Sequence, residues 1–162
     1  MNESLRLKEL ARLIRALENA GVYKFSIETF EDRLKLQKIV YIAKHFGIDL
    51  GYEFNEYIRG PYSPDLADDY YSLNEKWSDL RCLEEPLTCE EVEKLIEFLR
   101  GKSTAELEGI ATGLMFLKIL KRKGIYGEKD LRELLVGIIK SRKPFLSNIA
   151  ERLVDTVIET FN

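Results

Sequence analysis

Three aspartates, Asp65, Asp68 and Asp69, follow one another at helical spacing and could together bind a divalent cation. Carboxylate oxygens are the ligands that magnesium and calcium prefer in proteins. Acidic residues are equally favourable in the first turns of a helix, where they face water and interact with the helix dipole. This second interpretation is the simpler one, and we therefore expect no metal site and no cofactor.

The remaining reactive side chains do not form a catalytic set. His45 is the only histidine, and a metal site or a nucleophile–base pair usually combines a histidine with nearby partners. We expect it near the C-terminus of a helix, where the dipole favours its charged form. Cys82 and Cys89 match neither a disulfide framework nor a zinc spacing. We therefore expect no catalytic residues and a protein that is not an enzyme.

The composition is that of an ordinary globular chain. Its 162 residues are 45% hydrophobic, and 25 basic residues stand against 28 acidic ones, so no overall positive field attracts nucleic acid. The longest uncharged run, 109–117, is too short to cross a bilayer. The first residues lack the apolar core of a signal peptide, and two unpaired thiols suit a reducing compartment. We expect a cytoplasmic protein without a membrane-spanning segment.

The pattern of apolar residues predicts helices around one short β element. Residues 52–59 alternate between two faces and predict a half-buried strand, which Gly60 and Pro61 end. A second short strand near 80–83 is the candidate partner of that strand. The expected fold is mainly α, a helical bundle-like single domain over residues 1–162 that is winged-helix-like at most. Apolar stripes predict helices at 4–20, 30–46, 88–100, 104–123, 128–141 and 145–161, with another after residue 63.

Start signals sharpen the beginnings of several helices. Ser63 is placed as an N-cap with Pro64 in the first turn. Pairs of a hydroxyl residue and an acidic residue three positions later predict capping boxes. These pairs are Thr29 with Asp32, Thr88 with Glu91 and Ser103 with Glu106.

A structural motif links the helix at 30–46 to the Gly60-Pro61 turn. Gln37 lies near the buried side of this helix and needs hydrogen-bond partners, which the strand or the turn could supply. The Gly60-Pro61 turn is expected to set the angle between the strand at 52–59 and the helix that Ser63 caps. The motif consists of Leu36, Gln37, Lys38, Gly60, Pro61 and Ser63.

The same segments carry a resemblance to a known family. Asp32-Arg-Leu-Lys-Leu-Gln-Lys-Ile-Val-Tyr41, Gly51-Tyr-Glu-Phe54 and Tyr57-Ile-Arg-Gly-Pro-Tyr-Ser-Pro-Asp-Leu66 follow in this order. They resemble the YwgA-like family of small prokaryotic proteins, which is similar to the Panacea (SocA-like) antitoxin domain. The resemblance covers roughly residues 30–75. It implies a mostly helical fold with a small β element, no established enzymatic activity, and a role in neutralising a toxin or presenting it to a protease.

The leading functional hypothesis is a protein-binding module, antitoxin-like or a proteolytic adaptor, whose partner is a toxin or a client protein. Tyrosine is common at interfaces, and the segment around residues 52–71 is dense in it. The predicted contact surface combines aromatic anchors with charges of both signs. It comprises Tyr57, Arg59, Tyr62 and Asp65.

The alternative is a nucleic-acid-binding transcriptional regulator of winged-helix type. Four bases on the helix at 30–46, with the basic clusters 118–123 and 140–143, would have to contact phosphates. These four bases are Arg33, Lys35, Lys38 and Lys44. Assembly is open as well, because the apolar helix at 145–161 could pack either within its own chain or across the two-fold axis of a homodimer.

Overall fold

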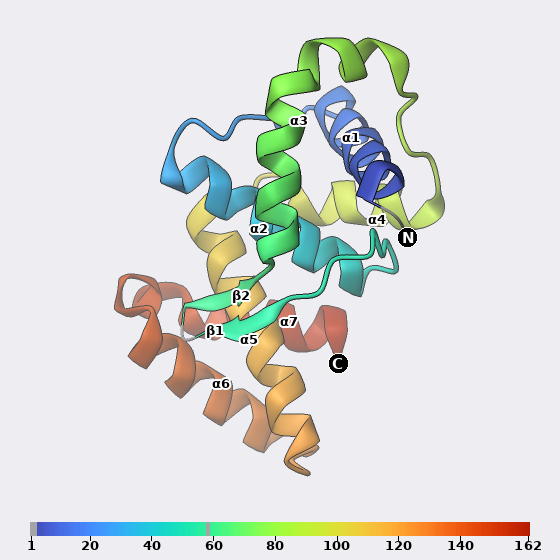
Figure 1. Ribbon diagram of the computed structural model, residues 1–162. Helices are drawn as coiled ribbons and strands as arrows, with labels where there is room; N and C mark the ends of the chain where they lie inside the picture. The colour runs from blue at the N-terminus through green and yellow to red at the C-terminus, as the bar shows by residue number, and fades with distance from the viewer. Residues whose placement is uncertain (1–2, 58) are drawn as a thin grey trace. The chain divides into compact units, whose positions relative to one another are not determined.

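The structure is a computed structural model that describes residues 3–57 and 59–162 (Figure 1). The described chain is mainly α-helical and has one two-stranded antiparallel sheet, which confirms the expected fold class. No helix in these residues is both long enough and apolar enough to cross a bilayer. The elements are α1 (Glu3–Asn19), α2 (Phe30–His45), β1 (Asn55–Tyr57), β2 (Gly60–Tyr62), α3 (Pro64–Leu83), α4 (Glu90–Leu99), α5 (Thr104–Arg122), α6 (Glu128–Arg142), the 3-10 helix η1 (Pro144–Ile149) and α7 (Ala150–Phe161).

The chain divides into two compact units that are interleaved in the sequence. Unit 1 consists of Met1–Phe54 and Ser63–Lys102, and unit 2 consists of Asn55–Tyr62 and Ser103–Asn162. The β-hairpin therefore belongs to unit 2, although it lies in the sequence between two helices of unit 1. The single domain over residues 1–162 stays a prediction.

Unit 1 is built on α1, which packs against α3 and α4. The apolar stripe predicted for α1 is fully buried, with Leu10, Leu13, Ile14 and Leu17 all at 0% exposure. The segment between α3 and α4 is fastened to the same helix by its backbone. The Leu87 N–H donates to the carbonyl of Arg12 at 3.0 Å, and the Arg12 Nε donates to the carbonyl of residue 85 at 3.2 Å.

A buried polar network inside unit 1 joins three segments that are distant in the sequence. Asp69, at 1% exposure, accepts hydrogen bonds at 2.7 Å from both Arg6 Nε and the Tyr52 hydroxyl. Burial, followed by the hydrogen bond to Asp69, raises the pKa of Tyr52 well above its usual value. The hydrogen bond to Asp69 likewise raises the pKa of Arg6. The network leaves no buried charge unpaired at this point of the core.

The aspartate cluster is divided by this network. Asp69 turns into the core, whereas Asp65 and Asp68 are exposed. Among the described residues, no three His, Cys, Asp or Glu side chains are placed to hold a metal ion. The solvent-facing interpretation was therefore wrong for Asp69, because Arg6 on α1 pairs with it in the interior.

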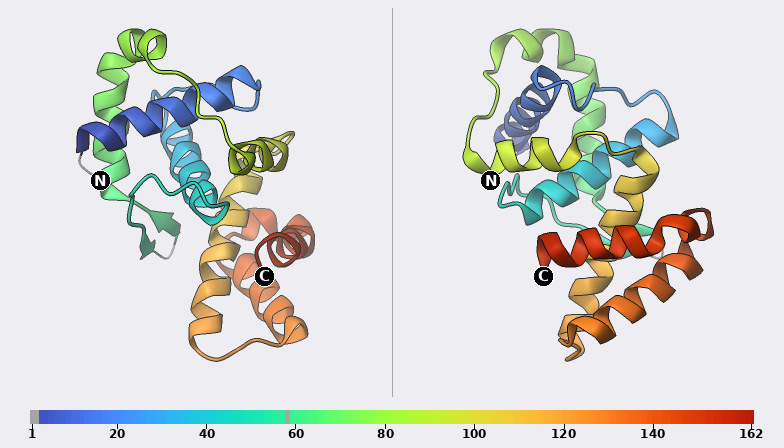
Figure 2. Two further views of the ribbon diagram at one scale, coloured as in Figure 1. Left: turned by 90° about the vertical axis from the view of Figure 1, so that its right-hand side faces the viewer. Right: turned by 180° about the vertical axis from the view of Figure 1, so that it is seen from behind.

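Unit 2 contains the hairpin and the helices of the C-terminal half, with α5 at its centre. Helices α6 and α7 both pack on α5, and the right-hand view of Figure 2 shows α7 crossing it. The crossing is close because α5 has glycines there: a Cβ added at Gly109 would lie 2.7 Å from a methyl carbon of Leu153. Val157 and Ile158 are buried, so within this chain the C-terminal helix packs on its own unit.

Most of the predicted helix starts are confirmed. Thr29 with Asp32 and Ser103 with Glu106 form reciprocal capping boxes, and the Ser63 hydroxyl accepts from the Leu66 N–H at 3.2 Å. The box predicted for Thr88 and Glu91 was wrong. The N-cap of α4 is residue 89, one position later, and its side chain makes no capping hydrogen bond.

The β element differs from its prediction in both strands. The predicted strand at 52–59 shortens to Asn55–Tyr57, and the Gly60-Pro61 pair, predicted to end it, instead opens its partner strand β2. The predicted second strand at 80–83 is the last turn of α3. Helix α3 runs this far because no glycine or proline interrupts it before Pro86.

Candidate protein-binding surface on the hairpin

The two faces of the hairpin have different characters. Its register pairs Asn55 with Tyr62, Glu56 with Pro61 and Tyr57 with Gly60. Because side chains alternate along a strand, Tyr57 and Tyr62 share one face, and Glu56 and Pro61 share the other. Strand β2 packs on α5, and Pro61 is buried. The tyrosines remain 49% and 36% exposed, so the tyrosine face is the outer one.

The two exposed tyrosines contact each other. The ring centroids of Tyr57 and Tyr62 are 6.0 Å apart with an interplanar angle of 65°, an edge-to-face arrangement. The Asn55 side-chain amide donates to the Tyr57 hydroxyl at 3.3 Å. Rings in this geometry attract each other through their quadrupoles. The pair thus forms a fixed aromatic platform on the outer face of the hairpin.

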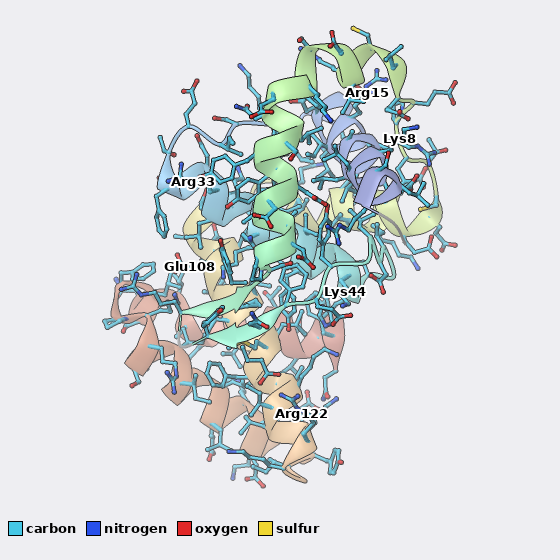
Figure 3. All side chains as sticks on the ribbon, in the orientation of Figure 1. Lys8, Arg15, Arg33, Lys44, Glu108 and Arg122 are labelled. Atoms are coloured by element: carbon cyan, nitrogen blue, oxygen red, sulfur yellow. The ribbon has the colours of Figure 1, made fainter. Side chains whose placement is uncertain are left out.

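One ion pair and one lysine hydrogen bond connect the hairpin to the helices of unit 2. Near β1, Arg122 of α5 forms an ion pair with Glu56. Near the turn, Lys143 donates to the Arg59 carbonyl at 2.9 Å and forms an ion pair with Glu108. Figure 3 labels the two side chains of α5 that make these contacts. Glu108 is the acceptor for Lys143, and Arg122 is the donor to Glu56. Lys143 is only 4% exposed, so its contacts are shielded from water and salt.

The first position of β2 has a positive φ angle, and glycine is the residue that adopts it without strain. The φ angle of Gly60 is +116°, in the region that side chains rarely adopt. Gly60 is also buried and lies opposite Tyr57 in the register. A glycine here lets the chain turn directly into Pro61, which packs toward α5.

Four residues of the structural motif predicted around Gln37 lie in unit 1, whereas Gly60 and Pro61 belong to unit 2. The Gln37 side-chain amide donates to the Ser63 carbonyl at 2.9 Å, and its oxygen accepts from the Ser63 N–H at 2.9 Å. Both residues are buried, as are Leu36 and Lys38. Gln37 thus satisfies both backbone groups of the residue that follows β2 and caps α3.

The four residues of the predicted contact surface are divided between the two units. Tyr57, Arg59 and Tyr62 lie together on the hairpin in unit 2, and the Arg59 side chain is exposed. Asp65 belongs to unit 1, in the first turn of α3, where it lies 3.7 Å from Arg6. We therefore restrict the candidate surface to the hairpin.

Sequence reasoning missed the residues that fix the hairpin. Arg122 and Lys143 belong to the two basic clusters, 118–123 and 140–143, that the sequence offers as phosphate contacts. Lys143 is 84 positions from Arg59 in the sequence, so no local pattern connects them.

Three of the four bases of α2 contact groups of unit 1, and the fourth is buried. Arg33 donates to the Ile27 carbonyl at 2.9 Å, and Lys44 donates to the Tyr52 carbonyl at 2.9 Å. The ammonium of Lys35 lies 5.8 Å from the centre of the Tyr23 ring, and Lys38 is only 2% exposed. These four side chains therefore do not form a free basic face on α2.

The histidine and the cysteines have simple surroundings. His45 is the last residue of α2, and its Nδ1 lies 2.9 Å from the Tyr41 carbonyl, in keeping with the expected position near a helix end. Cys82 and Cys89 are exposed free thiols.

The chain was compared with protein families, curated proteins and solved structures. No protein-family model, curated protein or solved structure matches the chain.

Proposed function

We propose that the protein is a protein-binding module that contacts its partner through the outer face of the hairpin. The observation that supports this most directly is the exposed Tyr57–Tyr62 pair, placed edge to face on an anchored strand pair. Tyrosine supplies a large contact area with a polar end and is enriched among the residues that dominate binding energy.

The anchoring favours binding because it lowers the entropy lost on association. Each immobilised side chain at an interface costs about 0.5–1.5 kcal/mol. The contacts of Glu56 with Arg122 and of Lys143 with the Arg59 carbonyl order the hairpin before a partner arrives. A partner then meets a surface that is already in its binding conformation.

The concrete forms of this function are an antitoxin-like protein or a proteolytic adaptor, with a toxin or a client protein as partner. The resemblance of residues 30–75 to the YwgA-like and Panacea families supports these forms. The alternative, a winged-helix type nucleic-acid regulator, would need basic residues other than the four on α2. It predicts binding to duplex DNA or RNA at low ionic strength, and no detectable binding there would rule it out.

The test is affinity capture from the source cells with three versions of the chain. The double variant Tyr57→Ala with Tyr62→Ala removes the aromatic platform. Tyr126→Ala is the matched control, because Tyr126 is a 69% exposed tyrosine of unit 2 outside the hairpin. We expect the control to retain the partners of the wild type and the double variant to lose them, since hot-spot residues are worth about 2 kcal/mol or more each. Equal capture by all three versions would refute the proposal.

A further inference from the structure

The two edges of the hairpin differ in their capacity to accept another strand. Residues of an antiparallel pair alternate between those that exchange both backbone hydrogen bonds and those whose groups point outward. Tyr57 and Gly60 are paired in the register and are separated by two residues in the sequence. In a hairpin of this length the pair beside the connection is the one that exchanges backbone hydrogen bonds. Glu56 and Pro61, the next pair, therefore direct their backbone groups to the outer edges.

The β2 edge is closed, whereas the β1 edge is open. Pro61 has no N–H to offer to an added strand, and it is buried in a strand that packs on α5. On β1, the Glu56 backbone makes no hydrogen bond to a described residue outside the hairpin. Glu56 is exposed. An extended segment can therefore pair with β1 but not with β2.

Basic side chains lie beside the open edge. The ion pair with Glu56 places Arg122 below β1, and Arg122 is 62% exposed. Lys118 is four residues earlier on α5 and shares that helix face with Arg122. Lys118 is exposed, and within the described part of the chain it forms no ion pair. Arg59 adds an exposed cation at the turn. Because Glu56 offsets the charge of Arg122, the remaining positive charge that a segment paired with β1 would meet among the described residues is that of Lys118 and Arg59.

We propose that the partner segment is an acidic, extended polypeptide that adds to the open edge of β1 as a third strand. This inference rests on the proposed function and specifies its partner. Backbone pairing with Glu56 supplies the register, the tyrosine platform takes an apolar side chain, and carboxylates of the segment reach Lys118 and Arg59. This is the strand-addition mode of peptide recognition, in which pockets and charges beside the edge set specificity.

The test begins with a library of random linear peptides displayed on phage and selected on the immobilised full-length chain. We expect the retained peptides to be rich in Asp and Glu and in β-branched residues. One selected peptide is then synthesised with and without N-methyl groups on alternate backbone amides. Its Kd is measured by fluorescence anisotropy for the wild type and for Tyr57→Ala, Lys118→Glu and Lys129→Glu. Lys129 is the matched control, because it is an exposed lysine of α6.

The expected results separate strand addition from other modes of binding. Lys118→Glu should weaken binding about fivefold, because it replaces an attraction of up to about 1 kcal/mol at the surface by repulsion. Lys129→Glu should leave the Kd unchanged. Methylation of the amides that face β1 should weaken binding roughly tenfold, since each lost hydrogen bond is worth about 1 kcal/mol. Added salt should weaken the binding of the wild type but not abolish it.

Four outcomes would overturn the inference. A selection that yields no peptides, or basic or uncharged ones, would exclude an acidic segment. Binding that Tyr57→Ala weakens but that neither Lys118→Glu nor N-methylation changes would refute strand addition and leave the proposed function standing. Binding that Tyr57→Ala does not change would refute the proposed function itself. Self-association of the free chain that Tyr57→Ala removes would assign the edge to a second copy.

Discussion

Three helical glycines of unit 2 allow the packing around α5 to be tested by one type of substitution. Gly109 and Gly113 lie on α5, and Gly137 lies on α6. A Cβ at Gly109 would come within 2.7 Å and 2.8 Å of methyl carbons of Leu153 and Leu146. At Gly137 no atom lies within 4 Å of an added Cβ. The same change to alanine should therefore have opposite effects at the two sites.

The magnitudes follow from two competing contributions. Replacing glycine by alanine inside a helix stabilises by about 1 kcal/mol, and this contribution is shared by all three positions. Overpacking a buried site costs about 1–3 kcal/mol, and Leu146 and Leu153 are each only 2% exposed, so their methyl groups cannot move into free space. We expect Gly137→Ala to stabilise by about 1 kcal/mol and Gly109→Ala to destabilise by up to about 2 kcal/mol. Gly113→Ala, with its nearest atom at 3.2 Å, should lie near zero.

The assay is urea unfolding followed by far-UV circular dichroism, with the midpoint and the m-value fitted for each variant. A change of 1 kcal/mol should also move Tm by about 2–4 °C in a chain of this size. The comparison is internal, because all three positions belong to unit 2. If Gly109→Ala raised the urea midpoint as much as Gly137→Ala, the close approach of α7 and η1 to α5 would be refuted.

Three further predictions concern the buried tyrosines, the turn and the last helix. Because the folded-state pKa of Tyr52 is raised, its stabilisation is fully present below the unfolded-state value near pH 10 and is lost as the pH rises above it. Alkaline unfolding curves should therefore be shallower for Tyr52→Phe, which also loses about 1–2 kcal/mol at neutral pH. Tyr23→Phe should cost less there, because the Tyr23 hydroxyl makes no hydrogen bond to a charged side chain among the described residues. Gly60→Val should cost about 2 kcal/mol in thermal unfolding, since the φ of +116° strains any β-branched residue; an unchanged Tm would contradict this account of the turn. Removal of residues 155–162 should lower Tm sharply through loss of the buried Val157 and Ile158, and removal of 159–162 alone, which leaves both in place, should not.

Those parts of the fold that depend on local chemistry could be predicted from the sequence. The stripe on α1, the capping boxes at Thr29 and Ser103 and the N-cap at Ser63 each involve residues a few positions apart. Periodicity and capping act over one or two turns of a helix, so a single sequence contains the necessary information.

Features that depend on distant partners could not be predicted in the same way. Asp69 is buried because Arg6, 63 positions away, supplies its counter-charge. Gly60 and Pro61 are common both where strands end and where hairpins turn, and the choice between these depends on packing against α5. The density of tyrosines indicated the candidate surface, but nothing in the sequence indicated that Lys143 would hold it from the far end of the chain.

The interleaving of the two units also constrains the order in which the protein can be completed during synthesis. The hairpin emerges from the ribosome well before Arg122 and Lys143, and unit 1 cannot close until the residues up to Lys102 have followed it. Chains fold from the N-terminus as they are made. The strands that carry the tyrosines therefore stay exposed, without their contacts to Arg122 and Lys143, until the last third of the chain has been synthesised. A nascent chain that stalls in α5 would present this aromatic surface to chaperones and proteases before it could present it to a partner.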